Sequence, residues 1–205
     1  MLAAGIDTMG IRVPPSQQAQ LLRFLELLAK WNGVYNLTAV RDPRDMLVVH
    51  LLDSLSILAL VDELQMRTLV DVGSGAGLPA IPLAITRPAI EIHSIDAVNK
   101  KIGFQLQAKA DLGLQRLHPL HARVESFVLP LPPSAIVSRA YTDLAKMLES
   151  IEHLVDASTR VIAMKGVEPT VEIAAIPASW VVQEIRKLEV PSLGAQRCAV
   201  VLKRA

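Results

Sequence analysis

The spacing of apolar residues changes near Thr68 and separates two parts of the chain. Ahead of Thr68, apolar residues recur every three or four positions, which predicts amphipathic helices over about 16–31 and 43–60. Residues 1–15 are expected to form a mobile lead-in, and Asn32-Gly33 is expected to end the first helix. The first part of the chain is therefore predicted to be helical.

From Thr68 onward, short apolar runs alternate with longer amphipathic stretches. Strands are predicted near 68–72, 90–95, 116–120, 134–138 and 159–164, and helices near 79–86, 98–112, 142–154 and 168–174. Two further apolar segments, 180–190 and 196–202, flank a turn at 191–194 and predict a C-terminal antiparallel hairpin. This order predicts an α/β fold with a mostly parallel sheet and helices on both faces. We expect an N-terminal helical extension, 1–66, packed on a core domain, 67–205.

A glycine-rich turn follows the first predicted strand. Gly73, Gly75 and Gly77 come directly after Leu69–Val72 and lead into an apolar helix. Glycine tolerates unusual φ values, and its missing Cβ lets a ligand lie against the backbone at a helix N-terminus. Dinucleotide-binding folds favour G-x-G-x-x-G, which argues against a nicotinamide oxidoreductase, whereas G-x-G-x-G behind an Asp indicates S-adenosylmethionine. The alternative is a glycine-rich turn that binds no ligand.

Asp96 follows the second predicted strand, about 20 residues beyond the glycines. A carboxylate at this place can accept hydrogen bonds from both ribose hydroxyls of a bound nucleoside. The alternative is that Asp96 caps the helix that begins near Val98. The two roles are compatible.

The ends of the later strands also carry polar residues. Val124 and Glu125 follow the third strand and are candidates for contacts with adenine, although Glu125 could simply be an acid at an exposed helix start. Arg139 ends the fourth strand and could contact the cofactor or an RNA phosphate, or form a surface ion pair. Both positions lie where open α/β sheets bind their ligands.

Four basic residues are expected near the same edge of the sheet. A basic rim suited to RNA phosphates is predicted from Lys100, Lys101, Arg123 and Lys165. Taken singly, each of these residues is expected on a solvated charged face, and only their placement together favours RNA. The net charge of the 205-residue chain is only +1, so any RNA contact has to come from such a local patch.

The remaining composition excludes several classes of protein. Cys198 is the only cysteine, which excludes an internal disulfide and suits a reducing cytoplasm. The apolar stretch 46–61 is interrupted by His50 and Asp53 and is too short to span a membrane. No signal peptide, metal-binding spacing or G-x-S-x-G nucleophile is present, and His50 and His93 are expected to be structural. We expect a soluble cytoplasmic protein without a metal.

Several motifs together resemble one bacterial family. They are Trp31-Asn-Gly-Val-Tyr-Asn-Leu-Thr38, His50-Leu-Leu-Asp-Ser54, Asp71-Val-Gly-Ser-Gly-Ala-Gly-Leu-Pro79, Ser138-Arg-Ala140 and Lys165-Gly166, in this order. From about residue 20 to the C-terminus the chain resembles the RsmG family, also called GidB (glucose-inhibited division protein B). The resemblance implies the class I, Rossmann-like fold of S-adenosylmethionine-dependent methyltransferases, with a seven-stranded sheet. It also implies methylation of N7 of a guanine in 16S ribosomal RNA, with that RNA or the small ribosomal subunit as partner.

The resemblance also assigns cofactor contacts. Carried over by position, they are Gly73, Leu78, Val124-Glu125 and Arg139, with Asp96 on the ribose. The chain departs from the family pattern at Leu78, where Phe is common, and at Ala80, where Gly is usual. The pairs Asp96-Ala97 and Lys100-Lys101 stand where Asp-Ser and Lys-Arg are frequent. Cofactor binding is expected to survive these changes.

Guanine N7 carries a lone pair and no proton, so the reaction needs no general base and no catalytic residue is expected. Tyr141 or Trp31 could stack on the target base, but both are expected in the core. Two alternatives remain open from the residues alone: a methyltransferase for a small molecule or protein, and a non-catalytic S-adenosylmethionine-binding regulator. A monomer is expected.

Overall fold

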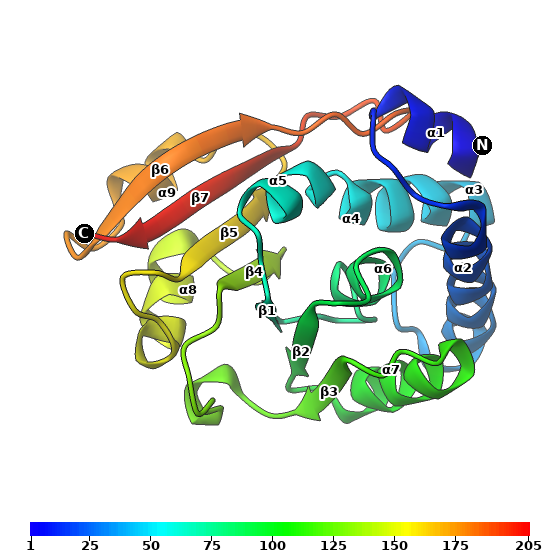
Figure 1. Cartoon of the computed structure of the whole chain (residues 1–205), viewed down its shortest axis with the longest axis horizontal. Helices are drawn as coiled ribbons and strands as arrows, with labels where there is room; N and C mark the ends of the chain where they lie inside the picture. The colour runs from blue at the N-terminus through cyan, green and yellow to red at the C-terminus, as the bar shows by residue number, and fades with distance from the viewer.

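A computed structural model describes all 205 residues and is built around a seven-stranded sheet with the order β3-β2-β1-β4-β5-β7-β6 (Figure 1). The strands are β1 (Thr68–Val72), β2 (Glu91–Asp96), β3 (Leu117–His121), β4 (Ala135–Arg139), β5 (Arg160–Lys165), β6 (Trp180–Lys187) and β7 (Cys198–Arg204). β1 to β5 are parallel, and β7 runs antiparallel between β5 and β6. The predicted parallel sheet with a terminal antiparallel hairpin is confirmed, and each strand begins within about two residues of its expected start.

Helices cover both faces of this sheet (Figure 1). They are α1 (Leu2–Thr8), α2 (Pro15–Tyr35), α3 (Pro43–Met46), α4 (Asp53–Leu55), α5 (Leu58–Glu63), α6 (Ala80–Thr86), α7 (Asn99–Leu112), α8 (Leu144–Ile151) and α9 (Thr170–Ala174). Successive strand residues point to opposite faces, so Leu69 joins the core beneath α1 to α7 while Val70 joins the core beneath α8 and α9.

The first fifteen residues are ordered against the rest of the protein. Leu2 and Ile6 lie one helical turn apart in α1 and are buried, as is Val13 in the following segment. Gly5 lies so close to Leu52 that a Cβ at this position would be 2.8 Å from a Leu52 methyl carbon. The expectation of a mobile lead-in was wrong because these apolar residues find a hydrophobic partner surface.

Helix α2 does not end at Asn32-Gly33 but continues to Tyr35. The Asn32 side chain is buried, donates to the carbonyl of Val40 at 3.1 Å and accepts from the backbone N–H of Thr38 at 2.9 Å. Its amide therefore bonds to the loop that follows α2 and does not compete with its own helix. The helix ends at Asn36, whose φ of 48° is left-handed.

The second N-terminal helix is not continuous, in contrast to the single helix predicted. Residues Leu47–Leu52 form a π-helical stretch between α3 and α4, and α5 follows a break at Ser56-Ile57. Widened turns of this kind are rare and often occur at functional sites. Here the stretch leaves the Val49 carbonyl directed at a side chain from β4, as described below.

The N-terminal helices and the sheet share one hydrophobic core. Phe24 of α2 lies against Phe104 of α7 with ring centroids 6.0 Å apart. The division into an N-terminal helical extension, 1–66, and a core domain, 67–205, stays a prediction. None of the helices combines the length and the apolar character needed to cross a membrane.

Candidate functional site

Two cavities open at the carboxyl ends of the strands, where the sheet order reverses between β1 and β4. In open α/β sheets this crevice is the usual ligand site. The larger cavity has a volume of about 550 Å³ and the smaller one about 130 Å³. Gly73, the first residue after β1, lines both, so one elongated ligand can lie across it.

The glycine loop requires glycine at Gly73 and Gly77. Both have positive φ, 70° and 80°. A Cβ at Gly73 would be 2.6 Å from the Tyr141 ring, and one at Gly77 would collide with Ile81 at the start of α6. Gly75 also has a positive φ, 59°, but a Cβ there would meet nothing within 4 Å, and this residue lines the larger cavity.

A buried polar network holds the glycine loop from behind. Gln105 of α7 accepts from Ser94 Oγ at 2.6 Å and donates through Nε2 to Ser74 Oγ and to the Gly75 carbonyl, both at 2.8 Å. Gln105 is not among the residues predicted from the sequence. The available signal was a polar residue within the apolar stripe of a helix, three positions after buried Ile102.

Asp96 ends β2 and lies beside the smaller cavity. Its Oδ2 accepts from the Gly75 N–H at 2.9 Å, and its Oδ1 accepts from the Val98 N–H at 2.8 Å, just ahead of α7. The Val98 N–H belongs to the residue ahead of α7, and α7 has no side-chain cap, so Asp96 fixes the approach to the helix and does not cap it. Because a carboxylate has about four acceptor sites, two remain for other donors, and ribose binding by Asp96 stays a prediction.

The rest of the smaller cavity comes from the residues after β3 and β4. Arg123, buried Val124 and exposed Glu125 line it, with Glu125 in a short 3₁₀ turn. Tyr141 lines it too and is 37% exposed, so its expected place in the core was wrong. The reason is Ala140, whose φ of 56° turns the chain after β4 and lays the Tyr141 ring over Gly73.

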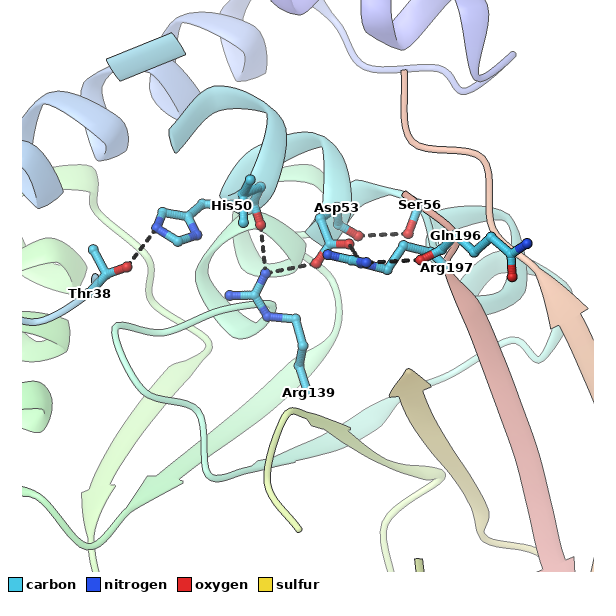
Figure 2. A network of polar contacts seen from close by, with 8 residues as sticks. Thr38, His50, Asp53, Ser56, Arg139, Gln196 and Arg197 are labelled. Atoms are coloured by element: carbon cyan, nitrogen blue, oxygen red, sulfur yellow. Dashed lines mark hydrogen bonds and ion pairs between the residues drawn. The ribbon is translucent and has the colours of Figure 1, made fainter. Parts of the chain in front are cut away.

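Arg139 at the end of β4 is held by a buried carboxylate in the larger cavity (Figure 2). Its Nη1 donates to Asp53 Oδ2 at 2.8 Å and to the Val49 carbonyl at 2.9 Å. Arg197, from the loop before β7, donates from Nε to Asp53 Oδ1 at 2.8 Å. Arg139 thus makes an ion pair, but a buried one in the site. The sequence analysis missed Arg197, which has no local motif and lies 144 residues from Asp53.

His50 also lines the larger cavity, one turn before Asp53 (Figure 2). Its Nε2 lies 3.0 Å from Thr38 Oγ1. Burial, together with the nearby Arg139 guanidinium, lowers the pKa of His50 to about 4, so the imidazole is neutral at neutral pH. His50 therefore forms part of the wall of the site.

Asp71 of β1 lies behind the glycine loop and is fully buried. Its Oδ2 accepts from the Ala80 N–H at 3.0 Å, whereas Oδ1 has no hydrogen-bond partner. Burial raises the pKa of Asp71 to about 7. The carboxyl group therefore ties the end of β1 to the first residue of α6, with the loop between them.

Three of the four predicted basic residues lie at the cavities. Lys101 and Lys165 line the larger cavity and Arg123 the smaller one. Lys165 Nζ also forms a 2.7 Å ion pair with Glu172 of α9. Lys100 lines neither cavity and instead donates from Nζ to the Tyr35 carbonyl at 2.8 Å, which ties α7 to the end of α2.

The sheet order, antiparallel β7 and glycine loop define a class I S-adenosylmethionine-dependent methyltransferase fold. Solved structures share it. A SAM dependent methyltransferase from Aquifex aeolicus matches with a TM-score of 0.56 and 18% identity, over 80% of this chain and 94% of that one. TrmN from Thermus thermophilus matches with a TM-score of 0.57 and 20% identity, over 72% of this chain and 48% of that one.

Sequence comparison identifies the family within this class. The family model GidB, described as rRNA small subunit methyltransferase G, matches residues 17–201. Ribosomal RNA small subunit methyltransferase G of Azoarcus sp. (strain BH72) is 47% identical, with 99% of this chain and 95% of that protein covered. The corresponding protein of Pseudomonas fluorescens (strain Pf0-1) is 42% identical, with 99% and 94% covered. The chain belongs to the rRNA small subunit methyltransferase G family, which confirms the resemblance and S-adenosylmethionine as cofactor.

Proposed function

We propose that this protein transfers a methyl group from S-adenosylmethionine to N7 of a guanine in the RNA of the small ribosomal subunit. The observation that carries the proposal is a surplus of positive charge in the larger cavity, next to the glycine loop. Family membership supports the reaction class, and the cavity supports an anionic substrate beside the cofactor.

The two cavities suit the two ends of the cofactor. We propose that the adenosine occupies the smaller cavity and the methionine end the larger one, on either side of Gly73. The proposed cofactor contacts are Gly73, Gly75, Gly77, Leu78, Asp96, Val124, Glu125 and Arg139; all of them line the cavities except Gly77, which packs against Ile81 and Gln105 and would act by shaping the loop. When bound, S-adenosylmethionine supplies an electrophilic methyl group on its sulfonium. Asp96 would orient the ribose through the acceptor sites that Gly75 and Val98 leave free.

The larger cavity carries more positive charge than S-adenosylmethionine can neutralise. Its charged lining consists of four cations, Lys101, Arg139, Lys165 and Arg197, and one carboxylate, Asp53. Counting the nearby partners Asp96 and Glu172 still leaves the cations in excess. S-adenosylmethionine itself has more positive than negative groups, so it does not neutralise this excess. Phosphates of an RNA do, because guanidinium and ammonium groups bind them directly.

We propose that Arg123, Lys101 and Lys165 contact RNA phosphates around the target nucleotide, since all three lie at the cavities. We also propose that Lys100 contacts an RNA phosphate, but outside the two cavities, next to the Tyr35 carbonyl at the end of α2. Phosphate contacts of this kind fix the position of the RNA and do not by themselves read its sequence.

The proposed reaction depends on alignment rather than on proton transfer. Guanine N7 has a lone pair and no proton to remove. Neither obvious candidate for a base is free to act as one, because both Asp53 oxygens are ion-paired and His50 is held against Thr38. Holding N7 in line with the methyl group can lower the activation free energy by about 7–11 kcal/mol at best. The glycine loop and the arginines fixed by Asp53 would supply this alignment.

Transfer of labelled methyl from S-adenosylmethionine tests the proposal. Purified protein is given small ribosomal subunits, naked 16S RNA or a protein extract, and labelled nucleosides are identified by mass spectrometry. We expect 7-methylguanosine from the RNA substrates and no label in protein. Label in protein, or at another atom of the RNA, would contradict the proposed substrate or position. We also propose that the enzyme acts as a cytoplasmic monomer, which sedimentation and cell fractionation test.

A further inference from the structure

An aromatic row leads from the core to the surface at the end of α2. Phe104 is buried, Trp31 lies against it with ring centroids 5.7 Å apart, and Tyr35 lies against Trp31 at 5.0 Å. Tyr35 is 45% exposed. The partly buried Trp31 ring and the buried Phe104 ring behind it fix the position of the Tyr35 side chain, while much of its own surface remains available to a ligand.

Two cations are bonded to the chain at residues 35 and 36. Lys100 donates from Nζ to the Tyr35 carbonyl at 2.8 Å, and Arg41 donates from Nη2 to Asn36 Oδ1 at 2.8 Å. Both bonds are to neutral oxygens, and neither side chain forms an ion pair. Both therefore keep their full charge at an exposed position. We name this surface the Tyr35 patch; it consists of Tyr35, Arg41 and Lys100, all exposed and joined through these hydrogen bonds at residues 35 and 36.

The residues of the Tyr35 patch are neighbours in the chain of residues that line the larger cavity. Asn36 has a φ of 48° and turns the chain, so that Leu37 and Thr38 line the cavity two and three residues after Tyr35. On α7, Lys101 lines the cavity and its neighbour Lys100 belongs to the patch. A chain molecule with one residue in the cavity can therefore place an adjoining residue on the patch.

We propose that the Tyr35 patch binds an unpaired nucleotide of the RNA substrate next to the target guanine. The base stacks on the Tyr35 ring, and the phosphate lies between Arg41 and Lys100. Exposed aromatic rings beside cationic groups are what single-stranded RNA requires, because every base has a face to stack and every linkage a negative charge. The proposal rests on an RNA substrate and adds a recognition surface outside both cavities.

Two variants test the stacking. In Tyr35→Ala the ring is lost, in Tyr35→Phe it is kept, and Val171→Ala on α9 is the control for loss of an exposed apolar side chain. We expect Tyr35→Ala to raise both the Kd for a fluorescent single-stranded fragment of 16S RNA and the KM for RNA about tenfold. Tyr35→Phe and Val171→Ala should match wild type, and all three should bind S-adenosylmethionine as wild type does.

A third variant tests the charge. Arg41→Gln should weaken RNA binding and lower the dependence of log Kd on log salt concentration by about one phosphate contact. A purely structural role of Arg41 would change the melting temperature and leave this slope unaltered. Arg23→Gln, on an exposed position of α2, is the matched control.

The outcomes separate this proposal from the proposed function. If wild type methylates RNA while Tyr35→Ala keeps the wild-type KM and the wild-type Kd for the fragment, the patch proposal is overturned alone. If Tyr35→Ala loses affinity for S-adenosylmethionine instead, Tyr35 supports the cofactor site and the proposal is also overturned. If wild type methylates no RNA, the proposed function fails, and the fragment Kd of the variants still decides whether the patch binds RNA.

Discussion

The ring of Tyr141 covers Gly73 so closely that a Cβ on Gly73 would be 2.6 Å from the ring carbon Cδ2. Gly73 lines both cavities and Tyr141 lines the smaller one. The backbone at Gly73, between the two cavities, therefore has no room for a side chain. This contact explains why the residue after β1 has to be glycine for steric as well as conformational reasons.

We predict that Gly73→Ala loses at least tenfold in affinity for S-adenosylmethionine. The methyl group would displace Tyr141 into the smaller cavity, and a left-handed φ costs a non-glycine residue about 1–2 kcal/mol. Calorimetric titration measures the affinity. Gly10→Ala is the control, because Gly10 has a φ of 64° and a Cβ there would meet nothing within 4 Å. Equal affinity in both variants would contradict the site.

Asp96→Ala should also lose cofactor affinity while the protein stays folded. The carboxylate accepts from two backbone N–H groups at the edge of the smaller cavity, and the proposed ribose bonds need its remaining acceptor sites. Asp96→Asn keeps an acceptor and should lose less. Calorimetry on the two variants gives the order of affinities, and circular dichroism checks the fold. Wild-type affinity in Asp96→Ala would exclude the ribose contact.

Replacing Asp53 with Ala should lower the free energy of unfolding by about 3–5 kcal/mol, because it leaves two guanidinium groups without their buried partner. The control is Asp62→Ala, which removes the exposed half of the Arg87–Asp62 pair and should cost at most about 1 kcal/mol. Urea denaturation measures both. Similar losses in the two variants would mean that the Asp53 pairs contribute no more than surface pairs.

The stability of the protein should depend on pH through Asp71. Burial raises its pKa from 3.8 to about 7, so between these values the unfolded chain ionises while the folded chain stays protonated. This contribution lowers the free energy of unfolding as pH rises from about 4 to about 7, and is constant above that range. Asp71→Asn cannot ionise and can still accept from Ala80, so it should gain stability over wild type through this range.

Urea denaturation of both proteins at a series of pH values measures that gain. His50, whose pKa is lowered to about 4, has the opposite effect: its contribution destabilises the fold as pH falls from 6.5 towards 4. Because His50 is present in both proteins, it cancels in their difference. A difference that does not change with pH would show that Asp71 is ionised in the folded protein at neutral pH.

Lys165→Ala should weaken RNA binding several-fold with little effect on cofactor affinity. Lys165 lines the larger cavity, but its Nζ is also paired with Glu172. The effect of losing this ion pair therefore has to be separated from the effect of losing an RNA contact. Glu172→Gln breaks the same ion pair and keeps the cation. Filter binding of 16S RNA should therefore weaken only in Lys165→Ala. Equal weakening in both variants would assign the effect to the packing of α9.

Features that depend on neighbouring residues could be predicted from the amino-acid sequence alone. Alternating apolar runs indicated the succession of strands and helices along the chain. The glycine spacing after Leu69–Val72 indicated the loop and its ligand class. Asp96 and Arg139 were predicted at strand ends, and both lie at the cavities because parallel strands end at one edge of the sheet.

Features that depend on residues far apart in the chain emerged only in the folded protein. Arg197 reaches Asp53 across 144 residues and has no local motif, and the polar Gln105 in the apolar stripe of α7 does not reveal that its partner is the glycine loop. Tyr141 leaves the core because of one left-handed residue, Ala140, which hydrophobicity does not reveal. Local spacing fixes which element forms, whereas the partner of a buried charge or amide is fixed only when the sheet brings distant elements together.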